Sequence, residues 1–231
     1  MNEVLRQEKK YLVNMVLARE LGAYLAAVMA EDAHSGAEGY SVRSLYFDTL
    51  NDRDFEDKVE GLELRRKIRL RVYDPSNDFA MLEMKQKEGD RQKKRSLRLE
   101  REEAKRLIRG DLTPLLGYQE PFAAELYALM SCRCYRPKAV VEYRRRAFLA
   151  KENKVRITID SRIIATEACF DIFSERLIQY PVLDPYNAVL EVKYNGFLPS
   201  YIKELASAAN CSEISVSKYC LARSVGLHYS G

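Results

Sequence analysis

The chain has 231 residues, of which 47% are hydrophobic and 31% are charged, and its formal net charge is +4. This composition supplies enough apolar side chains for a packed core and excludes wholesale disorder. The net charge is too small to indicate a nucleic-acid or membrane partner, but residues 58–98 contain thirteen basic and only seven acidic residues. We therefore expect one domain, over residues 1–231, with a concentrated basic region.

Cysteine and histidine usage argues against a disulfide framework and against a zinc site. The five cysteines are odd in number, none forms a CxxC pair, and the chain has only two histidines. Free thiols indicate a reducing cytoplasm. The N-terminus lacks an apolar signal core, and the longest apolar stretch, Leu21 to Ala30, is shorter than the ~20 residues of a membrane helix. We expect a cytoplasmic chain that enters no membrane and could reach one only through a partner protein.

Five segments have helical patterns. Asn14 is placed to cap the first, and Leu17, Leu21 and Leu25 fall on one of its faces. Gly110 ends the second, and prolines open the third and fourth. The predicted helices cover residues 14–29, 102–109, 121–131, 199–209 and about 215–225.

The predicted strands share one pattern, because each has an ionic face and an apolar face. In residues 64–73, for example, Arg69 and Arg71 alternate with Leu70 and Val72. The same alternation occurs in residues 6–10, 80–87, 139–148, 154–160 and 188–193.

Two architectures could explain this alternation. In a single strand, an ionic face is ordinarily the solvated side of an antiparallel sheet. Six such segments, dominated by arginine and lysine, favour a sheet that closes with its ionic faces inward. We therefore predict an α+β fold with an antiparallel eight-stranded β-barrel tunnel, which helices cover and plug.

A tunnel lined by cations would be stable only with a polyanion or with balancing acids, since like charges 4 Å apart repel by roughly 4 kcal/mol at an effective dielectric of about 20. Arginine forks suit phosphate oxygens. The interspersed glutamates suggest a divalent cation, which prefers oxygen ligands. The sequence shows no nucleic-acid-binding module, so we expect no nucleic-acid partner.

Several motifs, taken in order, give a specific resemblance over nearly the whole chain. They are RQEKKY (6–11), SLYFDT (44–49), KVEGLELRRKIRLRVY (58–73), LEMKQK (82–87), KKR (93–95), VVEYRRRAF (140–148), VRITID (155–160), LEVKYNGFLP (190–199) and SVSKY (215–219). In these motifs the chain resembles the catalytic (VTC) domain of the vacuolar transporter chaperone polyphosphate polymerases, especially their short bacterial relatives. That domain belongs to the triphosphate tunnel metalloenzyme, or CYTH-like, superfamily.

The resemblance implies ATP and polyphosphate as partners, Mn²⁺ or Mg²⁺ as cofactor, and a set of site residues. The implied metal carboxylate is Glu191; Glu8 and Glu83 could assist the metal or only balance charge. The implied catalytic residues are Lys10, Arg69, Arg71, Lys85, Arg144 and Arg156, and the implied substrate-binding residues are Arg6, Lys58, Lys93 and Lys218.

The implied reaction transfers the γ-phosphate of ATP to a growing polyphosphate chain. Two alternatives stay open: hydrolysis of inorganic or nucleoside triphosphate, and polyphosphate binding without catalysis. Hydrolases of the superfamily usually begin with Glu-x-Glu-x-Lys, whereas this chain has Arg6 in the first position, which weakens the hydrolase alternative.

Overall fold

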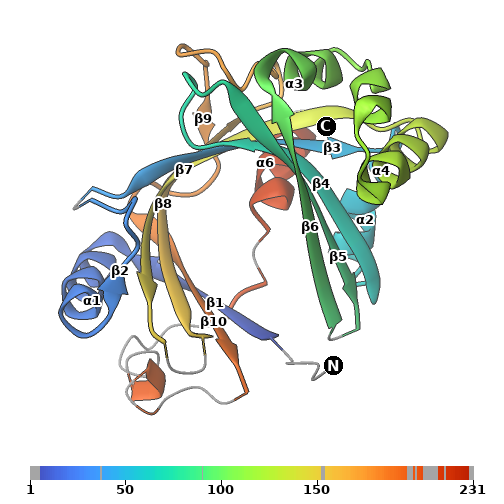
Figure 1. The fold of residues 1–231 in the computed structure, drawn as a ribbon. Coiled ribbons are helices and arrows are strands. Elements are labelled where there is room, and N and C mark those ends of the chain that lie inside the picture. Colours follow the sequence, from blue (N-terminus) through green and yellow to red (C-terminus); the bar gives the residue numbers. More distant parts are fainter. Residues whose placement is uncertain are drawn as a thin grey trace. The chain divides into compact units, whose positions relative to one another are not determined.

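A computed structural model describes residues 6–36, 38–89, 91–151, 154–196, 200, 202–204, 213–215 and 217–228. The chain divides into two compact units (Figure 1). The first unit comprises residues 1–41, 142–164 and 181–217, and the second comprises residues 42–141, 165–180 and 218–231.

The strands form an antiparallel sheet. In the first unit they are hydrogen-bonded in the order β1-β10-β8-β7, and in the second in the order β7-β3-β4-β5-β6; β2 pairs with β7, and β9 pairs with β8. The strands are β1 (Arg6–Asn14), β2 (Ala30–Glu31), β3 (Tyr40–Asp48), β4 (Leu64–Val72), β5 (Phe79–Glu88), β6 (Arg91–Glu100), β7 (Arg136–Leu149), β8 (Arg156–Thr166), β9 (Tyr180–Pro181) and β10 (Asn187–Asn195).

The described helices agree well with the sequence patterns. The predicted cap of the first helix is confirmed, because Oδ1 of Asn14 accepts a hydrogen bond of 2.8 Å from the backbone N–H of Leu17. The predicted helix over residues 199–209 lies mostly outside the described residues. The helices are α1 (Met15–Val28), α2 (Arg53–Val59), α3 (Arg101–Ile108), the 3-10 helix η1 (Thr113–Gly117), α4 (Pro121–Cys132) and α6 (Lys218–His228).

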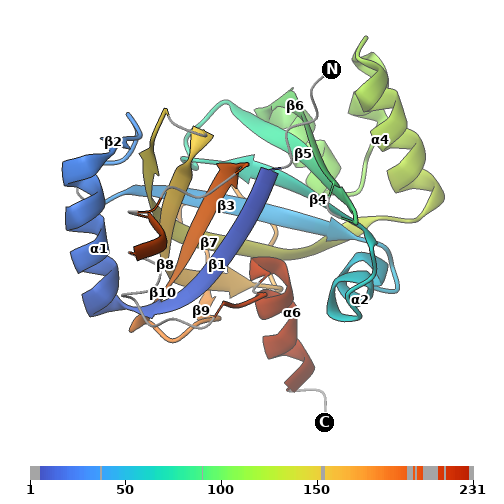
Figure 2. The ribbon, with the colours of Figure 1, turned by 90° about the horizontal axis from the view of Figure 1, so that it is seen from below.

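In the first unit, α1 covers the apolar side of the strands (Figure 2). Leu21 and Leu25 of α1 pack with Ile157 and Ile159 of β8 and with Leu190 of β10. The strand residues that alternate with these apolar ones therefore lie on the other side of the sheet.

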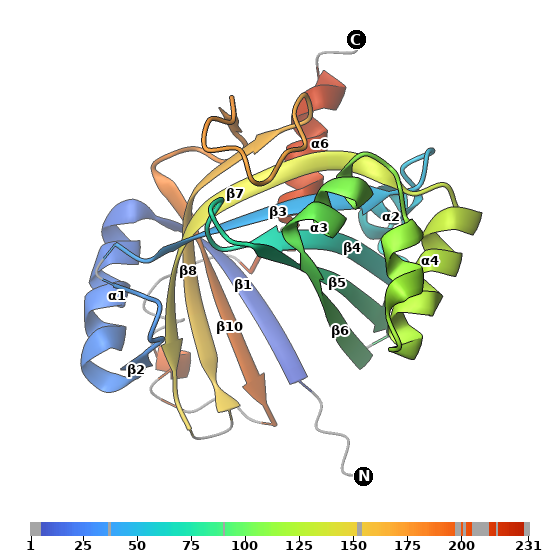
Figure 3. The ribbon, with the colours of Figure 1, turned by 45° about the horizontal axis from the view of Figure 1, so that its top comes forward.

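In the second unit, α3 and α4 lie against β5 and β6 (Figure 3). Leu107 of α3 and Leu126 of α4 belong to one core with Ile68 and Leu70 of β4 and Leu82 of β5. As in the first unit, one face of the strands is apolar and packed on helices, and the opposite face is ionic.

These observations confirm an α+β fold built on an antiparallel sheet whose main path has eight strands, with helices over its apolar faces. The elements α2, η1, β2, β6 and β9 were not predicted from the sequence. None of the described helices has both the length and the apolar character needed to cross a membrane.

Candidate functional site

The ionic face of β4, β5 and β6 in the second unit consists of paired cross-strand rows. Arg69 lies beside Glu83, and Glu83 lies beside Ser96; in the next row Lys67, Lys85 and Lys94 are neighbours. Side chains directly opposite each other on one face are close enough to interact. From Arg65 to Arg71 the face bears eight cations and one carboxylate: Arg65, Lys67, Arg69, Arg71, Lys85, Lys87, Lys94, Arg98 and Glu83.

Glu83 is the centre of this face. Its Oε2 lies 2.7 Å from Nη2 of Arg69 and 3.9 Å from Nη1 of Arg71, and its Oε1 lies 2.5 Å from Nζ of Lys94. Burial would raise the pKa of the Glu83 carboxyl, but the charges of Arg69, Arg71 and Lys94 outweigh it and lower the pKa to about 2. These contacts favour the charge-balancing role of Glu83 over a metal-binding one.

Hydroxyl groups from β3 also contact the two arginines. Nη1 of Arg69 donates to the hydroxyl of Tyr46 at 3.3 Å, and Nε of Arg71 donates to Oγ of Ser44 at 3.2 Å. These contacts hold the two guanidinium groups in fixed orientations, which suits the binding of phosphate oxygens.

The KKR motif contributes a different lysine from the one that the sequence suggested. Lys93 is in register with Gln86, on the same face of the sheet as Met84 and the apolar core, whereas Lys94 lies on the face of Arg69 and contacts Glu83. Lys58 lies in the last turn of α2. The structure thus brings Arg69, Arg71 and Lys85 together on one face, adds Lys94, and separates Lys93 from them.

The first unit has its own ionic face, on β1 and β10. Nζ of Lys10 lies 2.7 Å from Oε1 of Glu8 and 3.8 Å from Oε2 of Glu191. Lys193 contacts both glutamates as well, and its Nζ lies 3.7 Å from Oε2 of Glu8. Two carboxylates and two ammonium groups therefore alternate here. Arg6 belongs to β1, and its side chain lies outside the described residues.

Strand β8 extends this face with Arg156 and Thr158. Arg156 is in register with Lys193, and Thr158 is in register with Glu191. Nη2 of Arg156 lies 3.3 Å from Oδ2 of Asp32 and 3.3 Å from the hydroxyl oxygen of Tyr40. The Thr158 side chain is buried, and its hydroxyl has no hydrogen-bond partner among the described residues. A buried polar group without a partner is costly, so it indicates room for a ligand oxygen or water.

Strand β7 presents Arg145 on this face, and not the predicted Arg144. Nε and Nη2 of Arg145 each lie 2.7 Å from an oxygen of Asp160. Asp160 is fully buried and lies two residues after Thr158 on β8, on the same face of the strand. Burial would lower the pKa of Arg145, but the Asp160 charge raises it well above its ordinary value. Arg144 is exposed and lines a cavity on the α1 side with Ile159.

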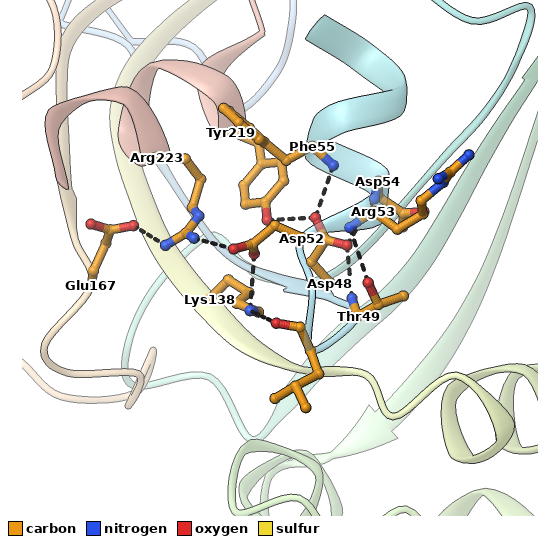
Figure 4. Close-up of polar contacts among 11 residues, drawn as sticks. Asp48, Thr49, Asp52, Arg53, Asp54, Phe55, Lys138, Glu167, Tyr219 and Arg223 are labelled. Atoms are coloured by element: carbon orange, nitrogen blue, oxygen red, sulfur yellow. Dashed lines mark hydrogen bonds and ion pairs between the residues drawn. The ribbon is translucent and has the colours of Figure 1, made fainter. Parts of the chain in front are cut away.

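Lys218 begins α6, and contacts within the second unit fix the orientation of this helix (Figure 4). The next residue, Tyr219, donates its hydroxyl to Oδ2 of Asp48 at 2.7 Å and stacks its ring on Tyr46 at 5.1 Å. One turn later, Arg223 pairs with Asp52 at 2.6 Å and with Glu167 at 2.5 Å. Through Tyr46, the start of α6 is coupled to the surroundings of Arg69.

Comparison with known proteins identifies the family. A family model described as the VTC domain matches residues 5–226. The chain belongs to the VTC domain family. Membership supports a function that involves polyphosphate or a triphosphate. No curated protein matches the sequence.

A solved structure agrees with the fold of this VTC domain. A protein from Bacillus halodurans named as a candidate adenylate cyclase is 12% identical, with 93% of each chain covered and a TM-score of 0.55. At this identity the likeness shows the fold alone. A protein from Pyrococcus horikoshii is also 12% identical, with 89% of this chain and 84% of that chain covered and a TM-score of 0.41.

The glutamates of the first unit fit a divalent cation. Glu8 and Glu191 share Lys10 and Lys193 as partners, so both carboxylates face the same two ammonium groups. The described residues contain no group of three or more metal-binding side chains. Two carboxylates together with substrate phosphates are the usual way in which proteins bind Mg²⁺, and the unpartnered Thr158 hydroxyl lies beside Glu191.

Proposed function

We propose that this VTC domain is an ATP-dependent polyphosphate polymerase. It would transfer the γ-phosphate of ATP to the end of a polyphosphate chain, giving ADP and a polymer longer by one phosphate. We place it in the cytoplasm, consistent with four described cysteines that are free thiols: Cys132, Cys134, Cys169 and Cys220.

The excess of cations on β4–β6 is the observation that carries this proposal. Within these rows of β4–β6 the acidic residue is Glu83, and its carboxylate is shared by Arg69, Arg71 and Lys94. Neighbouring lysines in one row repel each other unless an anion lies between them. A chain of phosphates supplies regularly spaced negative charges that could neutralise several rows at once.

The chemistry requires positioning rather than a protein nucleophile. A terminal oxygen of polyphosphate is already anionic and attacks the γ-phosphorus of ATP; a new P–O bond forms while the bond to the bridging β–γ oxygen breaks, and ADP leaves with that electron pair. In the second unit, Arg69, Arg71 and Lys85 would orient phosphate oxygens of the polyanion. In the first unit, Lys10, Arg145 and Arg156 would bind phosphate oxygens in the same way.

A divalent cation, Mn²⁺ or Mg²⁺, would be held by Glu191 and Glu8 and would neutralise phosphate oxygens when bound. The remaining predicted residues, Arg6, Lys58 and Lys218, would bind the polyanion in this proposal. Arg144 and Lys93 are not needed, because adjacent Arg145 and Lys94 occupy the ionic faces.

The test is polymer synthesis by purified protein. The protein is incubated with ATP and Mn²⁺, with and without a short polyphosphate primer, and the products are separated on a gel stained for polyphosphate. The variants are Arg69→Ala/Arg71→Ala for the second unit and Glu191→Gln for the first. A charge-matched control, Arg133→Ala/Arg176→Ala, removes two exposed arginines of the second unit that lie outside this face.

We expect a ladder from the wild type and the control, and at least a hundredfold less polymer from the Arg69/Arg71 variant. Phosphate release without a ladder, lost in the same variant, would instead assign a triphosphatase. Tight binding of polyphosphate without either product would assign a binding module.

A further inference from the structure

A second group of arginines lies on the α1 side of the first unit, away from Glu191. It surrounds a cavity of about 140 Å³, roughly ten times the smallest volume that holds one water molecule. The cavity is lined by Arg19 of α1, Arg144 and Arg146 of β7, Arg162 of β8 and the exposed Glu38, together with Met15, Ala18, Ile159 and Ser161. We call it the α1 pocket.

Backbone conformation brings these arginines together. Arg144 and Arg146 alternate on β7 and so share a face. Arg162 has a left-handed φ of 50°, and both it and the preceding Ser161 line the pocket, although adjacent residues of a regular strand point to opposite sides. A left-handed arginine costs on the order of 1–3 kcal/mol, which is typical of functional positions.

The helix also leaves room for the pocket. A Cβ atom at Gly22 of α1 would lie 2.7 Å from Nη1 of Arg146, too close for an ordinary contact. Glycine inside a helix costs roughly 0.5–1 kcal/mol relative to alanine. At this position it allows a guanidinium group to pass between helix and sheet.

The charges of the α1 pocket are poorly balanced. Arg146 is held by Oε1 of Glu31 at 3.0 Å. The side chains of Arg19, Arg144 and Arg162 form no hydrogen bond or ion pair within the part of the chain that the structure describes, and Glu38 is the single acidic residue in the lining. Three guanidinium groups of the pocket are therefore available to bind an anion, and Ile159 and Met15 form an apolar part of its lining.

We propose that the α1 pocket binds a compact, multiply charged phosphate anion. The site differs from the proposed polymerase face, because Arg145 and Asp160 lie on the opposite side of these strands. The phosphate could be free in solution or carried by a lipid headgroup, since both present the same oxygens to arginine. The inference stands independently of the polymerase proposal.

The test is calorimetric titration of the full chain with inorganic tripolyphosphate. Arg19→Ala/Arg162→Asn removes two forks of the pocket, and asparagine tolerates the left-handed conformation. The charge-matched control is Arg133→Ala/Arg176→Ala. Each pair is also introduced into the Arg69→Ala/Arg71→Ala background, in which phosphate binding by the proposed polymerase face is weakened. A parallel arm measures co-sedimentation with phosphatidylcholine vesicles that contain, or lack, a phosphatidylinositol phosphate.

We expect binding of tripolyphosphate in the Arg69→Ala/Arg71→Ala background to weaken at least tenfold with the pocket pair and to change less than twofold with the control pair. Pocket-dependent binding to the phosphoinositide vesicles, without pocket-dependent binding of tripolyphosphate, supports the site and assigns a lipid headgroup as its ligand. The proposal is overturned if the pocket pair alters neither, or if both pairs weaken binding equally. Binding by the pocket pair and the control pair is compared within the Arg69→Ala/Arg71→Ala background, so the comparison holds even if that protein makes no polymer.

Discussion

The hydroxyl of Tyr219 donates a 2.7 Å hydrogen bond to Oδ2 of Asp48, two residues that are 171 positions apart in the chain. Asp48 is fully buried and also accepts hydrogen bonds from the backbone N–H of Thr49, directly after β3, and from those of Asp54 and Phe55 at the start of α2. One carboxylate therefore joins the end of β3, the start of α2 and the start of α6.

Replacement of Tyr219 by Phe should destabilise the protein by about 1–3 kcal/mol, because Asp48 loses one hydrogen bond while it stays buried. Urea denaturation at pH 7 measures the loss. Tyr186→Phe is the matched control, since Tyr186 is 80% exposed and should tolerate the change within about 0.5 kcal/mol. Equal stability of the two variants would contradict the role given to this hydrogen bond.

Asp54 should make stability fall as pH rises. Burial and the nearby charge of Asp48 raise the pKa of its carboxyl to about 7, although the hydrogen bond from Tyr135 and the charge of Arg66 oppose them. Because the folded-state pKa exceeds the ordinary value of 3.8, the native state binds the extra proton. The stabilising contribution is complete below about pH 4 and is lost as pH rises through about 7.

Asp54→Asn tests this dependence. The amide removes the buried charge and keeps an oxygen for the Tyr135 hydroxyl, which lies 2.8 Å away in the wild type. We expect the variant to gain on the order of 1–2 kcal/mol over the wild type at pH 8, and to lose that advantage at pH 5. Denaturation curves at the two pH values give the comparison; a difference that does not change with pH would contradict the shifted pKa.

Glu83 should contribute to stability with the opposite pH dependence, and Glu83→Gln tests this. The Glu83 pKa is lowered from 4.5 to about 2 in the folded state, so its contribution is present above about pH 4.5 and is lost as pH falls toward 2. We expect the variant to be less stable by about 1–3 kcal/mol at pH 7, where Arg69 and Lys94 lose their shared carboxylate. Added tripolyphosphate should restore part of the loss in melting temperature, because it supplies the missing negative charge; no restoration would argue against phosphate binding on this face.

Truncation of two adjacent arginines of β7 should have very different effects on the stability of the protein. Arg145→Ala leaves the buried Asp160 without its bidentate partner and should cost about 3–5 kcal/mol. Arg144→Ala removes an exposed side chain and should change stability by less than about 0.5 kcal/mol. Chemical denaturation of both proteins at pH 7 decides the point, and Arg145→Ala/Asp160→Ala, which removes both charges, should recover part of the loss.

The sequence alone determined which segments alternate ionic with apolar residues, and this was sufficient for the antiparallel α+β class. Alternation has a period of two, so it predicts each strand wherever charged residues occupy one face only, as Glu191 and Lys193 do in β10. The caps and prolines located α1 and α4 for equally local reasons. In β6, residues 93–95 are consecutive cations, the alternation is hidden, and the strand was not predicted.

Only the tertiary structure decided which of several adjacent cations reaches the ionic face. In the run Arg144–Arg145–Arg146 the side-chain types are identical, so no local pattern selects the middle residue; the buried carboxylate of Asp160 on β8 does. Register with β5 likewise selects Lys94 over Lys93, because a shift of one residue moves a side chain to the other face. The α1 pocket depends on a left-handed residue and on the packing of a helix, both of which arise from contacts between segments that are distant in the sequence.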